Sequence, residues 1–189
     1  MTKQLFSCYT CNGLLEQAFG NPVSELADWL NAETPAGIHF KDVGGFDPRP
    51  PVQQRIVADV KADIEAGKQV IFIGHSLGAM LAYYLADELN AEGLKAPLLV
   101  AIDPTQWGTN VPPAAPWMLT PPTPGQYKAP PNVGTFINFH QPAYPGGGVC
   151  IAGGQDIPVP GVDHISIPNC NLVRQTILHA IGKVIGASP

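Results

Sequence analysis

The chain has 189 residues, 45% of them hydrophobic, which is enough for one sizeable core, so we expect a single domain over residues 1–189. A formal net charge of -5 without a cluster of Lys or Arg argues against a nucleic-acid partner. No stretch predicts a signal peptide or a membrane span, so we expect a cytoplasmic protein without integral membrane association, and secretion by another route stays open. The four cysteines do not present two paired zinc half-sites, so no metal is expected.

Strands and helices are predicted to alternate along the first third of the chain. An apolar run over residues 5–9 indicates a strand, and the apolar spacing within 26–30 indicates a helix. A short strand is predicted over 37–40, and a Pro-containing turn at 47–51 is predicted to end it. Apolar residues with a period near 3.6 then predict an amphipathic helix over 52–66.

The middle of the chain carries the clearest pattern. Residues 69–73 form a nearly continuous apolar and β-branched run, which is typical of a strand covered on both faces in a parallel sheet. A helix is predicted over 76–92 and a further apolar strand over 97–102. These two strands are expected at the centre of the sheet.

The last third begins with an unusual segment. Residues 104–133 are rich in Pro, lack periodicity and are too long for an ordinary connection, so we predict a lid or cap segment there. A strand over 133–139, a short strand or hairpin within 146–159 and a final helix over 170–185 follow. Strands that alternate with helices predict an α/β fold, a three-layer α/β/α sandwich around a mostly parallel sheet of five or six strands.

The strongest chemical signal is the run Gly74-His75-Ser76-Leu77-Gly78, which lies where a buried strand turns into a helix. A serine on such a turn projects its hydroxyl above the sheet, and the two glycines leave room for strand and helix to approach. The helix N-terminus beneath it stabilises negative charge. The alternative is that Ser76 is only a helix N-cap, but the coincidence of strand, motif and helix favours a nucleophile.

With this motif, the sequence resembles the α/β-hydrolase superfamily, and more closely its lipase-like or esterase-like and thioesterase-like members. The resemblance runs over most of the chain and implies a reduced core of about cutinase size, whose sheet starts at the strand that the full family calls its third. It also implies that nucleophile, acid and histidine follow one another in that order along the chain.

Asp103 is our candidate for the acid of the implied triad, because it closes the strand after the nucleophile strand, as in type I thioesterases and pancreatic-type lipases. Its role would be to accept a hydrogen bond from the histidine Nδ1 and stabilise the imidazolium. Asp156 in the Gly153-Gly154-Gln155-Asp156 loop is a rival. Asp163 is less well suited, since it directly precedes His164 and neighbouring side chains of an extended segment point apart.

His164 is our candidate for the general base, since it lies in the loop before the last helix, where the family keeps its catalytic histidine. His140 follows a strand and is expected to line the pocket instead. His39 is expected on a strand and His179 on the surface of the final helix. His75 occupies the variable position of the motif.

The resemblance also implies an oxyanion hole made of two backbone N–H groups. Leu77, directly after the nucleophile, is expected to supply one. Leu14 is expected to supply the other, since Asn12-Gly13-Leu14 stands where the family commonly has a His-Gly pair, and Asn12 replaces that His. We expect four side chains near the substrate: Asn12, His75, Trp107 and His140.

The four cysteines leave two questions open. Cys8 and Cys11 have the C-x-x-C spacing of a redox motif but fall at the end of a strand, which favours two buried or loop thiols. Cys150 and Cys170 flank the His164 loop, where a disulfide would brace it, although an intracellular setting would keep both thiols reduced.

The sequence therefore predicts a serine hydrolase that cleaves carboxylic ester or thioester bonds through an acyl-enzyme intermediate and requires no cofactor. The expected partner is a small-molecule ester or acyl substrate, and the oligomeric state stays open. The same triad serves esters and thioesters, so the choice between them stays open too. The alternatives are an acyltransferase and a catalytically silent hydrolase fold that acts as a binding module.

Overall fold

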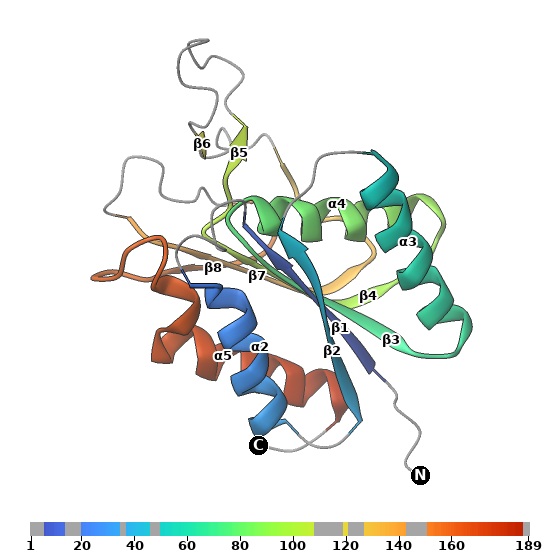
Figure 1. Ribbon diagram of the computed structural model, residues 1–189, viewed down its shortest axis with the longest axis horizontal. Coiled ribbons are helices and arrows are strands. Elements are labelled where there is room, and N and C mark those ends of the chain that lie inside the picture. The colour runs from blue at the N-terminus through green and yellow to red at the C-terminus, as the bar shows by residue number, and fades with distance from the viewer. Residues whose placement is uncertain are drawn as a thin grey trace.

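The computed structural model describes residues 6–13, 20–34, 37–45, 50–107, 119–120, 127–142 and 151–186. Its central feature is a six-stranded sheet in the order β2-β1-β3-β4-β7-β8 (Figure 1), in which every pair of neighbouring strands is parallel. The strands are β1 (Phe6–Asn12), β2 (Ile38–Gly45), β3 (Gln69–His75), β4 (Ala96–Ile102), β7 (Val133–His140) and β8 (Gln155–Pro158). The predicted parallel sheet is confirmed.

Helices cover both faces of the sheet and complete the predicted three-layer sandwich. On one face lie α2 (Pro22–Glu33) and α5 (Asn171–Ile185), whose buried apolar residues share a core cluster with those of the strands. On the other face lie α3 (Pro50–Glu65) and α4 (Leu77–Ala91), which contribute to a second cluster. A short 3-10 turn, η1 (Ile167–Asn169), precedes α5.

Strand β3 shows why the sequence forms this architecture. Val70 and Phe72 pack into the core under α3 and α4, whereas Ile71 and Ile73 pack into the core under α2 and α5. All four are fully buried. A strand with helices on both sides needs apolar residues at odd and even positions, which is the pattern predicted over 69–73.

The boundaries differ from the predictions at α3 and β8. Helix α3 begins at Pro50, inside the turn predicted at 47–51, because proline lacks an N–H that the first helical turn does not use. The feature predicted within 146–159 is the strand β8, which pairs in parallel with β7 and is therefore not one arm of a hairpin with it. Residues 143–150 lie outside the described part of the chain.

The predicted lid segment, 104–133, is described only in part. Within it, β5 (Gln106–Trp107) and β6 (Leu119–Thr120) form a two-stranded antiparallel pair. The remaining stretches, 108–118 and 121–126, lie outside the described residues. The lid therefore remains a prediction.

The cysteines of β1 point to opposite faces of the sheet. Cys8 belongs to the core cluster on one side and Cys11 to the cluster on the other, as expected of residues three apart in a strand, and neither is in a disulfide. Burial also raises the pKa of the Cys8 thiol far above its ordinary value. The pair therefore lacks the geometry of a redox motif. Cys170 is a free thiol, and Cys150 lies outside the described residues.

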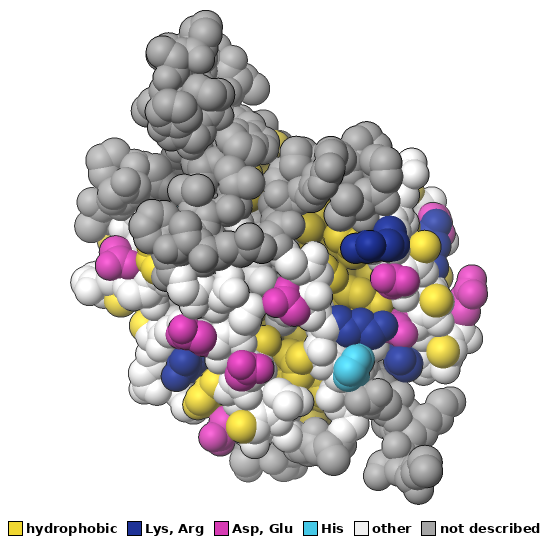
Figure 2. All heavy atoms as spheres, in the orientation of Figure 1, with side chains coloured by type: hydrophobic (Ala, Val, Ile, Leu, Met, Phe, Trp, Pro, Cys, Tyr) yellow, Lys and Arg dark blue, Asp and Glu magenta, His cyan; other side chains and the backbone are white. Residues whose placement is uncertain are grey.

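The surface mixes charges. On the face seen in Figure 2, acidic and basic side chains are interspersed and apolar patches appear between them. Within the described ranges, no helix combines the length and hydropathy that a bilayer span requires. The same ranges hold no group of three or more His, Cys, Asp or Glu side chains arranged as metal ligands.

Candidate active site

Ser76 lies on a sharp turn between β3 and α4, at the carboxyl edge of the sheet. Its backbone angles, φ 58° and ψ −127°, lie in a region that residues with a side chain rarely adopt. Two hydrogen bonds hold the turn: the Ser76 N–H donates to the carbonyl of Ile102 at 3.0 Å, and the Thr105 N–H donates to the carbonyl of Ser76 at 3.2 Å. The strained backbone is thus tied to the neighbouring strand β4 and the loop after it.

The two glycines of the motif allow this turn to exist. A Cβ on Gly74 would lie 2.2 Å from the carbonyl oxygen of Gly78, and a Cβ on Gly78 would lie 2.0 Å from the carbonyl oxygen of Cys11. Contacts this short with backbone atoms are sterically forbidden. The glycines therefore let the start of α4 pack directly on the ends of β1 and β3, as the sequence pattern predicts.

Asp103 follows β4 directly and is completely buried. Its Oδ2 lies 2.6 Å from Nδ1 of His164, and its Oδ1 accepts a hydrogen bond from the Gln141 N–H at 3.2 Å. An ionised carboxylate can only accept, so we assign the imidazole proton to Nδ1. That tautomer leaves the Nε2 lone pair of His164 available to take a proton.

His164 lies on the loop between β8 and η1, 61 residues beyond Asp103 in the sequence. The preceding residue, Asp163, accepts hydrogen bonds at its Oδ1 from the N–H of Ile165 (3.0 Å) and the N–H and hydroxyl of Ser166 (2.7 and 2.8 Å). These bonds, those from Ser166 first, lower the pKa of the Asp163 carboxyl. Asp163 thus shapes the loop that carries His164, and the hydrogen bonds of its carboxylate go to this loop and not to the imidazole.

The Ser76 hydroxyl makes a different contact from the one that the triad predicts. Its Oγ lies 3.0 Å from Oγ1 of Thr105, and both residues are buried. Ser76 and His164 both belong to the described part of the chain, and there they are not hydrogen-bonded to each other. The structure therefore brings Asp103 to His164 and Thr105 to Ser76.

The rival acid, Asp156, lies beside another histidine. Its Oδ1 is 3.1 Å from Nδ1 of His140 and accepts a hydrogen bond from Nδ2 of Asn138 at 2.9 Å. The Asp156 side chain is 38% exposed, whereas that of Asp103 is 0% exposed. Of the three candidate carboxylates, only Asp103 is hydrogen-bonded to the His164 ring within the described residues.

The residues predicted for the oxyanion hole are only partly described. Leu77 is the first residue of α4, so its N–H is not used by the hydrogen bonds of the helix. Leu14 lies outside the described residues. Asn12 is buried at the end of β1, where its Nδ2 donates to Oδ1 of Asp42 at 2.8 Å and approaches the Ser24 hydroxyl at 3.4 Å. Among the residues that the structure describes, its Oδ1 finds no hydrogen-bond partner.

The model of the alpha/beta hydrolase family matches residues 19–162, which is more than half of the chain. The chain belongs to the alpha/beta hydrolase family. Its predicted resemblance to the superfamily is thereby confirmed. None of the curated proteins matches the sequence of this hydrolase.

Solved structures with the same fold include esterases and thioesterases. The ferulic acid complex of Est1E from Butyrivibrio proteoclasticus is 12% identical to this α/β hydrolase, with a TM-score of 0.63 and coverage of 95% of this chain and 89% of Est1E. Human thioesterase 2 is 12% identical, with a TM-score of 0.55 and 98% coverage of both chains. RedJ, a thioesterase of prodiginine biosynthesis in Streptomyces coelicolor, is 12% identical, with a TM-score of 0.53 and coverage of 94% and 85%. Identities this low establish the fold alone.

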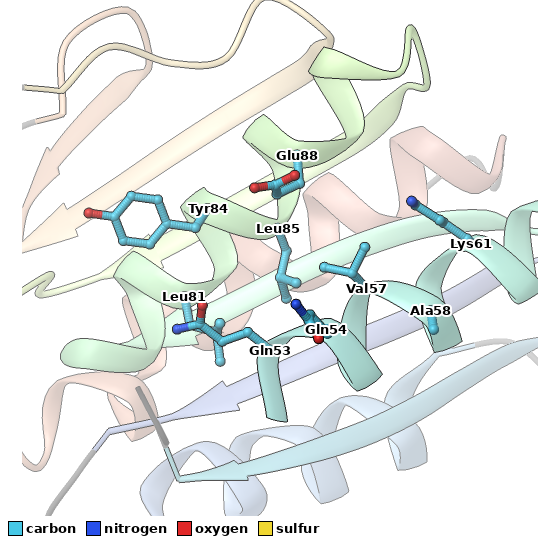
Figure 3. Close-up of a pocket in the computed structure, with 9 residues that line it drawn as sticks. All are labelled: Gln53, Gln54, Val57, Ala58, Lys61, Leu81, Tyr84, Leu85 and Glu88. Atoms are coloured by element: carbon cyan, nitrogen blue, oxygen red, sulfur yellow. The ribbon is translucent and has the colours of Figure 1, made fainter. Parts of the chain in front are cut away.

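A cavity of about 650 Å³ lies between helices α3 and α4 of the hydrolase. Leu85 of α4 points toward Gln54 and Val57 of α3, and the charged residues Lys61 and Glu88 also line the cavity (Figure 3). None of the predicted site residues whose side chains the structure describes lines it. The cavity is thus separate from the group around Ser76 and His164.

Three residues of the α/β hydrolase site were missed from sequence. Thr105 stands two residues after Asp103, and a hydroxyl so close to the predicted acid is a signal that could have been used. Gln141 contacts Asp103 through its backbone N–H, which no side-chain pattern reveals. Asp42 holds Asn12 from the neighbouring strand β2, a contact that depends on strand order. Trp107 lies in β5, and its side chain is outside the described part.

Proposed function

We propose that this protein is a serine hydrolase that cleaves carboxylic ester or thioester bonds, with Ser76 as nucleophile, His164 as general base and Asp103 as the acid that orients it. The proposal depends chiefly on one observation, the 2.6 Å contact between Nδ1 of His164 and the fully buried carboxylate of Asp103. A buried carboxylate in this place fixes the tautomer of the imidazole and stabilises its protonated form.

In the proposed reaction, the Ser76 hydroxyl turns from Thr105 toward His164. Nε2 of His164 takes the hydroxyl proton while Oγ attacks the carbonyl carbon of the substrate. The N–H groups of Leu77 and Leu14 stabilise the oxyanion of the tetrahedral intermediate. The imidazolium then protonates the leaving alcohol or thiol, and an acyl group remains on Ser76.

In the second half of the reaction, water is the nucleophile and Ser76 is the leaving group. His164 takes a proton from a water molecule, which attacks the acyl carbon, and the proton passes to Oγ as the carboxylic acid leaves. Both halves use one tetrahedral geometry for esters and thioesters. Two kinds of neighbour support both substrate classes for this fold. Est1E is an esterase that binds ferulic acid, and human thioesterase 2 and RedJ are thioesterases.

The test is intact-mass spectrometry after treatment with a fluorophosphonate, which reacts covalently with activated serines. The parent protein should gain one adduct, Ser76→Ala should gain none, and His164→Ala should label only at a slow residual rate. Asp103→Asn should label far more slowly than the parent, whereas the matched variant Asp156→Asn should label at the parental rate because Asp156 contacts His140.

The competing proposal is a binding module on a catalytically silent hydrolase fold. The hydrogen bond that turns the Ser76 hydroxyl toward Thr105 instead of His164 is the observation that favours it. A parent protein that gains no fluorophosphonate adduct would decide for the binding module. An adduct that persists in Ser76→Ala would assign the reactivity to another residue.

A further inference from the structure

The residue directly before Ser76 is a histidine whose surroundings set it apart from an ordinary core residue. His75 is the last residue of β3 and is 0% exposed. It lies on the face of the sheet that is covered by α2 and α5, since it alternates with Ile71 and Ile73 of that core cluster. This is the same side from which the His164 loop approaches.

His75 makes two contacts with His164, which is 89 residues away in the sequence. Its Nε2 lies 2.7 Å from the backbone carbonyl oxygen of His164. A carbonyl oxygen can only accept, so Nε2 of His75 carries a proton and donates it. The two imidazole rings also pack against each other, with centroids 4.6 Å apart and planes inclined by 37°.

These contacts add to the bond to Asp103 and to the hydrogen bonds of Asp163 that shape the loop. His164 stands on an irregular loop, and its side chain is 21% exposed. Such loops move more readily than the elements they connect. A displacement of about 1 Å between reacting groups can slow an enzyme by about 100-fold. The hydrogen bond from His75 connects this loop directly to the strand that carries Ser76.

We propose that His75 is a positioning residue that fixes His164 relative to Ser76. The end of β3 would thus deliver the nucleophile through Ser76 and anchor the general base through His75. His164 is then held at three points. His75 contacts its backbone carbonyl and one face of its ring, and Asp103 contacts its Nδ1. This inference rests on the proposed function of Ser76 and His164.

Two amide variants separate the donor from the bulk of the side chain. His75→Gln places an N–H at nearly the reach of Nε2, so it should keep the hydrogen bond to His164. His75→Asn is shorter by one methylene, so its amide should not reach the carbonyl. We expect fluorophosphonate labelling of His75→Asn to be about 10- to 100-fold slower than that of the parent, and His75→Gln to recover most of the parental rate.

Steady-state kinetics on p-nitrophenyl butyrate provide a second readout. A misplaced base lowers kcat and leaves KM nearly unchanged, because His164 acts on the transition state and not on substrate binding. Thermal unfolding of each variant shows whether it is folded. Equal rates for the Gln and Asn variants, in folded protein, would overturn the proposal.

A double-mutant cycle tests whether His75 acts through His164. In the His164→Ala background, His75→Asn should leave the residual labelling rate unchanged, because the anchored ring is gone. A further slowing there would assign His75 a general packing role and contradict the inference. If the parent does not label at all, the proposed function fails; if the parent labels and His75→Asn labels equally fast, only the role of His75 fails.

Discussion

The hydroxyl groups of Ser76 and Thr105 lie 3.0 Å apart and share a hydrogen bond. Thr105 also donates its N–H to the carbonyl of Ser76, so it holds the residue from both its backbone and its side chain. A serine hydroxyl carries a single proton, which it can donate to one acceptor at a time. Either hydroxyl can donate in this pair; in the arrangement in which Ser76 donates, its proton must turn from Thr105 to His164 before Oγ attacks a substrate.

Removing the Thr105 hydroxyl should make Ser76 more reactive. A neutral hydrogen bond contributes about 0.5–1.5 kcal/mol, so we expect Thr105→Val to label with fluorophosphonate about 2- to 10-fold faster than the parent. Thr105→Ser keeps the hydroxyl and should label at the parental rate. Slower labelling of the Val variant would mean that Thr105 assists the attack instead of restraining it.

Replacing Asp103 should affect turnover far more than stability of the fold. Asp103→Asn keeps the shape of the side chain but presents an amide to His164, which favours the wrong tautomer, so kcat should fall by about 10³- to 10⁴-fold. Hydrolysis of p-nitrophenyl butyrate measures this change. Asp156→Asn is the matched control and should stay within about twofold of the parent. A larger loss of kcat in Asp156→Asn than in Asp103→Asn would identify Asp156 as the acid of the triad.

A methyl group at Gly78 should disrupt the packing of α4 on β1. Its Cβ would lie 2.0 Å from the carbonyl oxygen of Cys11, a backbone atom that cannot move away freely. Overpacking of this kind costs about 3 kcal/mol or more. Urea denaturation of Gly78→Ala should therefore show a large loss of stability. Gly186→Ala is the control, since its φ is 71° and no atom lies within 4 Å of the new Cβ, so about 1 kcal/mol is expected.

The buried carboxylate of Asp63 should make the free energy of unfolding depend on pH in the acid range. Burial alone would raise the pKa of Asp63, but hydrogen bonds from Lys41 at 2.6 Å and Lys68 at 2.9 Å outweigh it and hold this pKa well below its ordinary value. The folded state thus favours the ionised form. The resulting stabilisation is present above the unfolded pKa of about 4 and is lost as pH falls below it toward the lowered pKa.

Asp63→Asn measures this contribution. At pH 7 the variant should be less stable than the parent by about 2 kcal/mol, since hydrogen bonds to charged groups contribute about that much. In urea denaturation the difference should shrink as the pH is lowered below about 4. Glu92→Gln breaks an exposed pair with Lys61 and should change stability by less than about 1 kcal/mol. A pH-independent difference for Asp63→Asn would contradict the assignment.

Much of the fold could be predicted from the spacing of apolar residues along the sequence. The apolar run at 69–73 predicts a strand with helices on both sides, and β3 lies at the centre of such a sheet. The start of α3 was missed because Pro50 and Pro51 signal a turn as strongly as a first helical turn. The pairing of β8 was left open, because a four-residue strand carries too few positions to show a period.

The sequence by itself determined the alternation of strands and helices, the turn at Ser76 between its two glycines, and the family. Each of these depends on residues close together in the chain, where spacing reports which face a side chain occupies. Only the tertiary structure decided that Asp103 rather than Asp156 meets His164, that Thr105 holds the Ser76 hydroxyl, and that His75 contacts His164. Those contacts join residues 29 to 89 positions apart, so they depend on strand order and loop conformation, which local spacing does not encode.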